Sequence, residues 1–157
     1  MLSAESLQKI DREVAKYPAE QKQSAVMAAL RIAQQEKGWL AEDTIKAVAD
    51  YLGMPPIAAY EVATFYNMYN TKPVGRHKLT VCTNLPCRLT QQHDIGAYLQ
   101  KKLGIAWGET TDDGKFTLTE GECMGSCDGA PLLLHNNHKM CSHLTPEAVD
   151  KLLSELE

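Results

Sequence analysis

The sequence has no glycine-rich nucleotide-binding fingerprint, no long apolar run and no concentration of positive charge. Neither G-x-G-x-x-G nor a P-loop pattern occurs among its 157 residues, so we do not expect this chain itself to bind a nucleotide cofactor. No segment approaches the roughly 18 continuous apolar residues of a membrane-spanning helix. The net charge is −4 and no cationic run exceeds two residues, which argues against a general nucleic-acid binder.

The N-terminus lacks the uninterrupted apolar core of a secretory signal peptide, because charged residues are spread through it. We therefore expect a cytoplasmic protein that does not insert into a membrane and whose thiols stay reduced. The chain has five cysteines. In a reducing compartment they indicate metal ligands or redox groups rather than a framework of disulfides.

The first part of the chain has the periodicity of a small helical bundle. Helices are predicted at residues 3–16, 18–38, 41–52 and from 55 onward. Ser3 is a suitable cap for the first, and Gly38 and Gly53 end the second and third. In the last helix we expect burial of one stripe with helical spacing: Val62, Phe65, Tyr66 and Tyr69.

A segment rich in proline, glycine and cationic residues, 70–78, separates two predicted domains, 1–72 and 73–157. Beyond it we predict strands at 77–84, 115–122, 131–136 and 138–143, and helices at 86–103 and from Thr145 onward. The order β-α-β-β-α favours a parallel pair of strands followed by a hairpin. The predicted fold is mixed, α+β or α/β: a small helical bundle followed by a thioredoxin-like domain.

Four of the five cysteines form two pairs near predicted strand ends. Cys82 and Cys87 lie in CTNLPC after the first strand, and Cys123 and Cys127 follow the second. If both pairs lie at one end of the sheet, four thiolates converge on one site. Four thiolates suit either a [2Fe–2S] cluster or a structural zinc ion. The cysteine spacing is compatible with either metal centre, and also with disulfides or with four unrelated buried thiols. A thioredoxin-type redox pair is disfavoured because the sequence has no C-x2-C motif.

Three glycines, Gly121, Gly125 and Gly129, surround the second pair in GECMGSCDGAP. Because glycine permits tight turns and close approach, we expect backbone N–H groups to approach the sulfurs here. A helix start at Pro86 adds free N–H groups beside Cys87.

The segments CTNLPC and ECMGSCDGAP, with YEVATFYNMY at 60–69, resemble the E-chain family of bacterial respiratory complex I, the proton-pumping NADH:quinone oxidoreductase. The resemblance covers nearly the whole chain. It implies a thioredoxin-like [2Fe–2S] ferredoxin domain preceded by a helical domain. It also implies that the cluster ligands are Cys82, Cys87, Cys123 and Cys127.

The resemblance further implies partners: a flavoprotein subunit that holds FMN and the NADH site, and other subunits of the peripheral arm, on the cytoplasmic side of the inner membrane. The cluster would exchange single electrons with FMN, off the main chain of clusters that leads to quinone. The chain is then an oxidoreductase subunit that is not catalytic alone. Related subunits serve soluble NAD-dependent hydrogenases and formate dehydrogenases. The alternative from a different functional class is an interaction module in which the cysteines bind a structural zinc ion and no electrons are transferred.

Several residues receive plainer interpretations. Ser126 stands where the family commonly has alanine, and we expect its hydroxyl or N–H to raise the reduction potential. Cys141 is interpreted as a buried, inert thiol, and the five histidines as surface or satisfied core residues, because they show no paired ligand spacing. We expect four cationic residues near the cluster end, chiefly as solvated charges: Lys72, Arg76, Lys78 and Arg88.

Overall fold

The computed structural model describes residues 2–90 and 94–156. The chain divides into two units, Met1–Pro73 and Val74–Glu157, and each has a hydrophobic core of its own. Within the described residues, no helix combines the length and the apolar character needed to cross a lipid bilayer.

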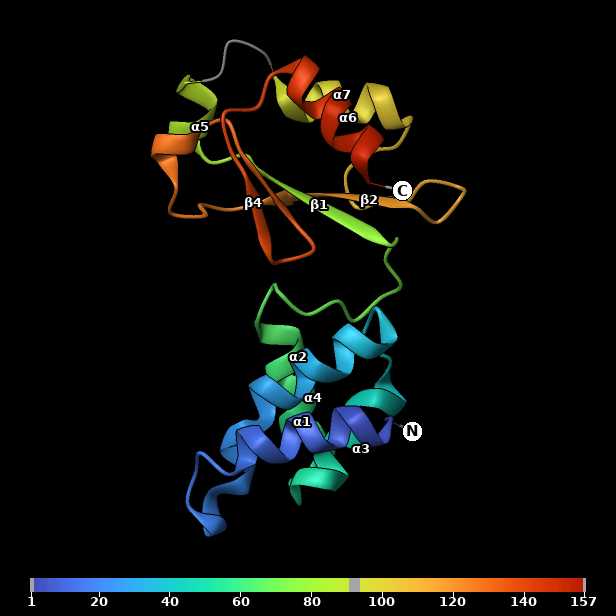
Figure 1. The fold of residues 1–157 in the computed structure, drawn as a ribbon, viewed down its shortest axis with the longest axis vertical. Coiled ribbons are helices and arrows are strands. Elements are labelled where there is room, and N and C mark those ends of the chain that lie inside the picture. Colours follow the sequence, from blue (N-terminus) through green and yellow to red (C-terminus); the bar gives the residue numbers. More distant parts are fainter. Residues whose placement is uncertain (1, 91–93, 157) are drawn as a thin grey trace. The chain divides into compact units, whose positions relative to one another are not determined.

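The first unit is a helical bundle (Figure 1). Its α-helices are α1 (Ala4–Val14), α2 (Val26–Lys37), α3 (Glu42–Leu52) and α4 (Pro56–Phe65). The helix predicted over 18–38 is divided, because a 3-10 helix at Ala19–Ala25 precedes α2. At Gln21 the backbone leaves helical geometry, with φ −113° and ψ 29°. The remaining helix predictions for this unit hold to within a few residues.

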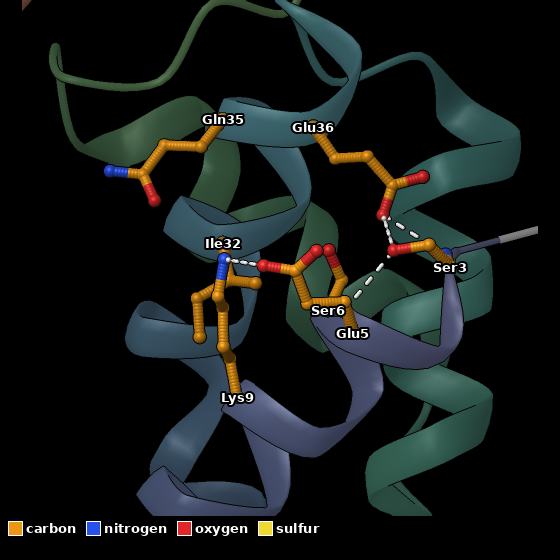
Figure 2. Close-up of a pocket in the computed structure, with 7 residues that line it drawn as sticks. All are labelled: Ser3, Glu5, Ser6, Lys9, Ile32, Gln35 and Glu36. Carbon is orange, nitrogen blue, oxygen red and sulfur yellow. Dashed lines mark hydrogen bonds and ion pairs between the residues drawn. The ribbon is translucent and has the colours of Figure 1, made fainter.

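A hydrogen-bond network at Ser3 fixes the start of α1 against α2 (Figure 2). The Ser3 hydroxyl accepts a hydrogen bond from the Ser6 amide at 3.2 Å and donates one to the Glu36 carboxylate at 3.0 Å. Hydrogen bonds from Lys37, Ser6 and Ser3 lower the pKa of Glu36 to about 2. A polar pocket in this region is lined by Ser3, Ser6 and Glu36, among others. The role of these three side chains in capping α1 explains why polar groups gather there.

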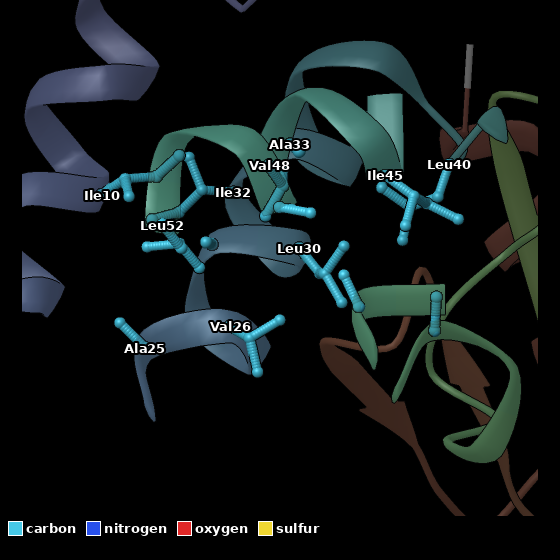
Figure 3. Packing of buried hydrophobic residues seen from close by; sticks show 14 of the residues in the cluster. Ile10, Ala25, Val26, Leu30, Ile32, Ala33, Leu40, Ile45, Val48 and Leu52 are labelled. Atoms are coloured by element: carbon cyan, nitrogen blue, oxygen red, sulfur yellow. The ribbon is translucent and has the colours of Figure 1, made fainter. Parts of the chain in front are cut away.

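Aliphatic side chains from all parts of the bundle form its core (Figure 3). Leu30, Ile45 and Val48 are almost completely buried in it. Small residues such as Ala33 on α2 let the helices approach one another closely.

The apolar stripe predicted for α4 is only partly buried. Tyr69 is 7% exposed and its hydroxyl donates to the Met27 carbonyl at 2.8 Å, but Phe65 is 79% exposed. The helix ends at Phe65, and Tyr66 has extended backbone angles. The helical spacing that was used to place these side chains on one face stops before Tyr66, which is 38% exposed, so the prediction of burial is wrong for Phe65 and Tyr66.

The second unit is built on a mixed sheet with strand order β2-β1-β3-β4. The strands are β1 (His77–Cys82), β2 (Phe116–Gly121), β3 (Leu133–His135) and β4 (Lys139–Cys141). β1 pairs in parallel with β2 and antiparallel with β3, and β3 and β4 form a hairpin. The predicted mixed fold, with a parallel first pair and a final hairpin, is confirmed. The Ala130–Pro131 peptide before β3 is cis.

Two helices, α6 (Ile95–Leu103) and α7 (Pro146–Glu155), lie side by side over one face of this sheet (Figure 1). The single helix predicted over 86–103 corresponds to α5 (Leu85–Thr90) and α6, and its residues 91–93 lie outside the described part of the chain. Asp94 caps α6 by accepting a hydrogen bond from the Ala97 amide at 3.0 Å. The sheet and both helices share one core, which includes Leu79, Val81, Ile95, Leu99, Leu118, Leu133 and Val149.

Replacing one leucine in this core tests the packing. Leu118 is 0% exposed, whereas Leu89 on α5 is 76% exposed. We expect Leu118→Ala to lower the free energy of unfolding by about 2–5 kcal/mol and Leu89→Ala by less than about 0.5 kcal/mol. Urea unfolding followed by circular dichroism measures both. Equal losses in the two variants would contradict the core assignment.

Candidate metal centre

The parallel register of β1 and β2 brings both cysteine pairs to one end of the sheet. Cys82, the last residue of β1, lies directly opposite Gly121, the last residue of β2. The Thr83 amide donates to the Gly121 carbonyl at 3.0 Å, which holds the two strand ends together. Cys87 then follows in α5, and Cys123 and Cys127 follow β2.

The four thiols are close enough to affect one another's protonation. The pKa of Cys87 is raised to about 11, first by burial, then by a hydrogen bond with Cys82 and by the nearby thiols of Cys127 and Cys123. The pKa of Cys127 is also raised, first by burial and then by Cys123 and Cys82. Gathered thiolates disfavour one another in this way unless a positive charge lies among them. This donor set therefore fits metal ions.

The mutual influence extends across the two pairs, because Cys127 acts on the pKa of Cys87 and Cys82 acts on the pKa of Cys127. Over residues 2–90 and 94–156, no three His, Cys, Asp or Glu side chains are grouped so as to hold a metal ion. A [2Fe–2S] cluster takes two thiolates on each of two irons, whereas a structural zinc ion takes its ligands in one tetrahedral shell, and four cysteines suit either centre.

The two pairs differ in exposure. Cys82 and Cys87 are 7% and 2% exposed, whereas Cys123 and Cys127 are exposed to solvent. The inner pair is covered by an apolar cluster with Leu132, Met124 and Ala130. One side of the centre is therefore closed to water, and the other side reaches the protein surface.

The glycines around the second pair have structural reasons of their own. A Cβ on Gly121 would lie 2.7 Å from the Thr80 side chain, and one on Gly129 would lie 2.7 Å from the Ser142 hydroxyl. Gly125 has open space around it but a φ of 72°, which side chains with a Cβ rarely adopt. Packing and turn geometry therefore require these residues, and backbone approach to the sulfurs stays a prediction.

The Ser126 hydroxyl points to a different partner from the one predicted. It donates to the Asp128 carboxylate at 3.3 Å, so this hydroxyl is engaged away from the sulfurs. The part of the prediction that concerns the Ser126 N–H stays untested.

Two of the cationic residues predicted near the cluster end lie elsewhere. β1 runs from His77 to Cys82, so Lys78, and Arg76 just before the strand, lie at its opposite end. The prediction is therefore wrong for these two, because the direction of the strand was not taken into account. Lys72 belongs to the first unit. Arg88 does lie on α5, directly after Cys87.

Cys141 stands apart from the other four cysteines. It lies on β4 opposite Leu133 and is partly buried, and burial raises the pKa of its thiol. The predicted burial is therefore only partial, and the predicted inertness of this thiol stays a prediction.

One pair of residues was missed by the sequence analysis. His77 Nδ1 lies 3.0 Å from His135 Nε2, and the Nε2 atom of His77 is buried without a hydrogen-bond partner. His77 is therefore not a satisfied core residue. The two histidines are 58 residues apart, so short-range ligand spacing could not reveal them. The only indication in the sequence that they could meet was that each lies in a predicted strand, 77–84 or 131–136.

A mixed sheet with two pairs of cysteines at and just after the ends of its parallel strands is the arrangement expected of an iron–sulfur domain of the electron-transfer class. The chain belongs to the thioredoxin-like [2Fe–2S] ferredoxin family, whose sequence model matches residues 10–157. The cofactor of this family is a [2Fe–2S] cluster.

Relatives and solved structures agree with this family. The chain is 46% identical to the E subunit of NADH-quinone oxidoreductase from Rickettsia felis over 143 residues, which cover 90% of this chain and 85% of that protein. It is 39% identical to the mitochondrial NADH dehydrogenase [ubiquinone] flavoprotein 2 of Dictyostelium discoideum, covering 98% of this chain and 62% of that protein. A crystal structure of an NAD+-reducing [NiFe]-hydrogenase shares the fold, with a TM-score of 0.69 at 20% identity, over 81% of this chain and 22% of the other.

The difference between the pairs predicts their reactivity in the metal-free, reduced chain. Because its pKa is raised to about 11 and it is buried, Cys87 has almost no thiolate at neutral pH. We expect iodoacetamide to modify the exposed Cys123 first and Cys87 last, with Cys87 reacting only as pH approaches 11. Peptide mass spectrometry across a pH series measures the order. Equal rates at neutral pH would contradict the burial of the inner pair.

Proposed function

We propose that the chain is the electron-transfer subunit of an NADH-quinone oxidoreductase and that Cys82, Cys87, Cys123 and Cys127 bind its [2Fe–2S] cluster. The observation that carries the proposal is the convergence of two thiol pairs at one end of the sheet. Family membership over residues 10–157 supports the choice of cluster. The similarity to the Rickettsia felis protein along 90% of the chain supports the choice of parent complex.

The residues of this chain hold the cluster and set its surroundings. When bound, the cluster supplies one-electron transfer. Cys82 and Cys87 bind it from the buried side, where Leu132 excludes water. Cys123 and Cys127 would bind it from the exposed loop, which is the side of the site that a partner could approach. Excluding solvent from one side of the cluster would tune its reduction potential. Leaving the other side at the protein surface would permit electron exchange with a partner.

The partner in this proposal is a flavoprotein subunit that carries FMN and the NADH site, together with other peripheral-arm subunits on the cytoplasmic side of the membrane. Hydride chemistry belongs to such a cofactor, and the sequence of this chain has no nucleotide-binding fingerprint. The chain is then one part of an oxidoreductase and inactive toward NADH alone.

A second candidate is the equivalent component of a soluble NAD-dependent hydrogenase. The fold similarity to the NAD+-reducing [NiFe]-hydrogenase favours it. The identity is only 20% there, compared with 46% to the Rickettsia felis protein, so the quinone-reducing complex is the better supported parent.

Metal analysis tests the ligand assignment. We expect the anaerobically purified chain to hold about two irons and two sulfides and to give an S = 1/2 EPR signal after reduction by dithionite. Cys87→Ser removes one ligand and is expected to lower iron content and change the signal. Cys141→Ser is the matched control and is expected to leave both unchanged. One zinc per chain with no sulfide would instead support the structural module.

The role in the complex has a separate test. If the cluster exchanges electrons with the partner flavin, losing it changes how long electrons stay on the flavin and reach oxygen. We expect Cys87→Ser to alter superoxide or peroxide output of the assembled complex during NADH oxidation, while Cys141→Ser leaves it unchanged. Unaltered output from complexes shown by EPR to lack this cluster would count against the role.

A further inference from the structure

Two histidines from neighbouring strands meet at the end of the sheet opposite the cysteines. His135 lies opposite Leu79, and His77 is two residues before Leu79, so both imidazoles share the face of the sheet that α6 and α7 cover. The ring centroids are 5.2 Å apart, with His77 Nδ1 3.0 Å from His135 Nε2. On its other side His77 contacts the ring of Phe116, with 5.6 Å between centroids.

The contact between the two rings favours one tautomer of His77. Its Nε2 atom is buried without a partner, and a buried N–H with no acceptor costs about 1–3 kcal/mol. The favoured arrangement therefore has the proton of His77 on Nδ1, from which it donates to a bare Nε2 of His135. Adding a proton to His135 Nε2 puts two N–H groups face to face. This repulsion between the two N–H groups is relieved only if His77 carries its proton on Nε2, where it has no hydrogen-bond partner.

The charged groups around the pair also oppose protonation. Lys139 lies directly opposite His135 on β4. The Lys115 ammonium lies 5.2 Å from the centre of the Phe116 ring, whereas Lys78, next to His77 on β1, faces the other side of the sheet.

The carboxylates of the covering and neighbouring segments are engaged with other groups. On α7, Asp150 accepts hydrogen bonds from Tyr98 and Lys102 of α6, and Glu155 pairs with Lys151. In the turn before β2, Asp113 accepts from the Thr111 hydroxyl and the Lys115 amide. Lys139 is therefore the cation that lies beside His135, and these nearby carboxylates are bonded elsewhere.

The pair is located where the segment between the two units joins the sheet. The amides of Arg76 and His77 donate to the carbonyls of Gly114 and Lys115 at 3.1 and 2.8 Å. The Gly75 amide donates to the Thr117 hydroxyl at 2.6 Å. These bonds fasten residues 75–77 to the edge of β2, next to the ring of His77.

We infer that His77 and His135 form a proton-sensitive clasp, which holds residues 75–77 on the sheet while both imidazoles are neutral and loosens them when the pair gains a proton. The clasp does not depend on the cluster or on the parent complex, because it rests only on contacts at the opposite end of β1.

The direction of the pH effect follows from linkage. The pKa of His135 is lowered by burial, by His77 and by Lys139, so the unfolded chain takes up this proton more readily than the folded chain. The stabilisation is complete above about pH 6.5, the ordinary pKa of histidine. It is lost as the pH falls below that value toward the lowered pKa.

Amide hydrogen exchange of the full, cluster-loaded chain tests the clasp. Exchange is followed by mass spectrometry at about pH 7.5 and about pH 5.5, on either side of the ordinary histidine pKa, and rates are corrected for the intrinsic effect of pH. We expect protection of the peptide around residues 75–78 to fall several-fold at the lower pH relative to α6. His135→Gln can present its side-chain Oε1 as an acceptor for the His77 Nδ1–H group and does not titrate, so this dependence should disappear.

The matched control is His138→Gln, in the exposed turn between β3 and β4, which should keep the wild-type pH dependence. Protection that is independent of pH in the wild type, or a dependence that survives in His135→Gln, overturns the inference. If His135→Gln does not fold, side-chain 15N NMR of the wild-type chain decides. A bare Nε2 on His77 at neutral pH supports the clasp, and a protonated Nε2 overturns it.

Discussion

The parallel pairing of β1 with β2 is the constraint on which the rest of the site depends. Each cysteine pair is fixed to the end of one of these strands, so a slip of one residue would separate the pairs and turn every side chain to the opposite face. Two local features hold the register. Gly121 has no room for a side chain beside Thr80, and the Thr80 and Thr119 hydroxyls meet at 2.9 Å across the strands. Gly121 precedes the loop that carries Cys123 and Cys127, but its small size serves the alignment of β1 with β2.

Burial of one thiol pair has an energetic consequence that links the cluster to folding. Burial raises the pKa of Cys87, so the metal-free chain keeps this sulfur protonated and the site does not carry its full negative charge. If these cysteines hold the cluster, metal binding would displace such protons, and metal affinity would depend on pH and on the packing of Leu132 beside Cys82 and Cys87. The pKa of Cys127 is raised as well, but Cys123 and Cys127 remain open to solvent. The division between a buried and an exposed pair therefore balances stability of the centre against access for electrons.

Much of the architecture could be predicted from the sequence because the signals are local. Alternating apolar residues identified β1 and β2, glycines ended α2 and α3, and the two cysteine pairs stood near predicted strand ends. The errors concern relations that local patterns do not contain. Phe65 was assigned to a buried stripe that continues past the end of α4. Arg76 and Lys78 were placed near the cysteines because strand direction was not considered, and the contact of His77 with His135 exists only through the register of β1 with β3.

The two ends of β1 carry separate chemistry, and the geometry of a strand explains why they can. From His77 to Cys82 the strand extends over roughly 17 Å, about twice the distance over which physiological salt screens exposed charges. A proton gained at the histidine end is therefore best screened from the exposed thiols, Cys123 and Cys127. Any coupling between the two ends has to pass through the hydrogen-bond ladder of β1 with β2, the same ladder that aligns Cys82 with Gly121. Because a sheet ladder holds one register or another rather than deforming continuously, loosening of residues 75–77 leaves the cysteine end intact as long as the central pairs hold.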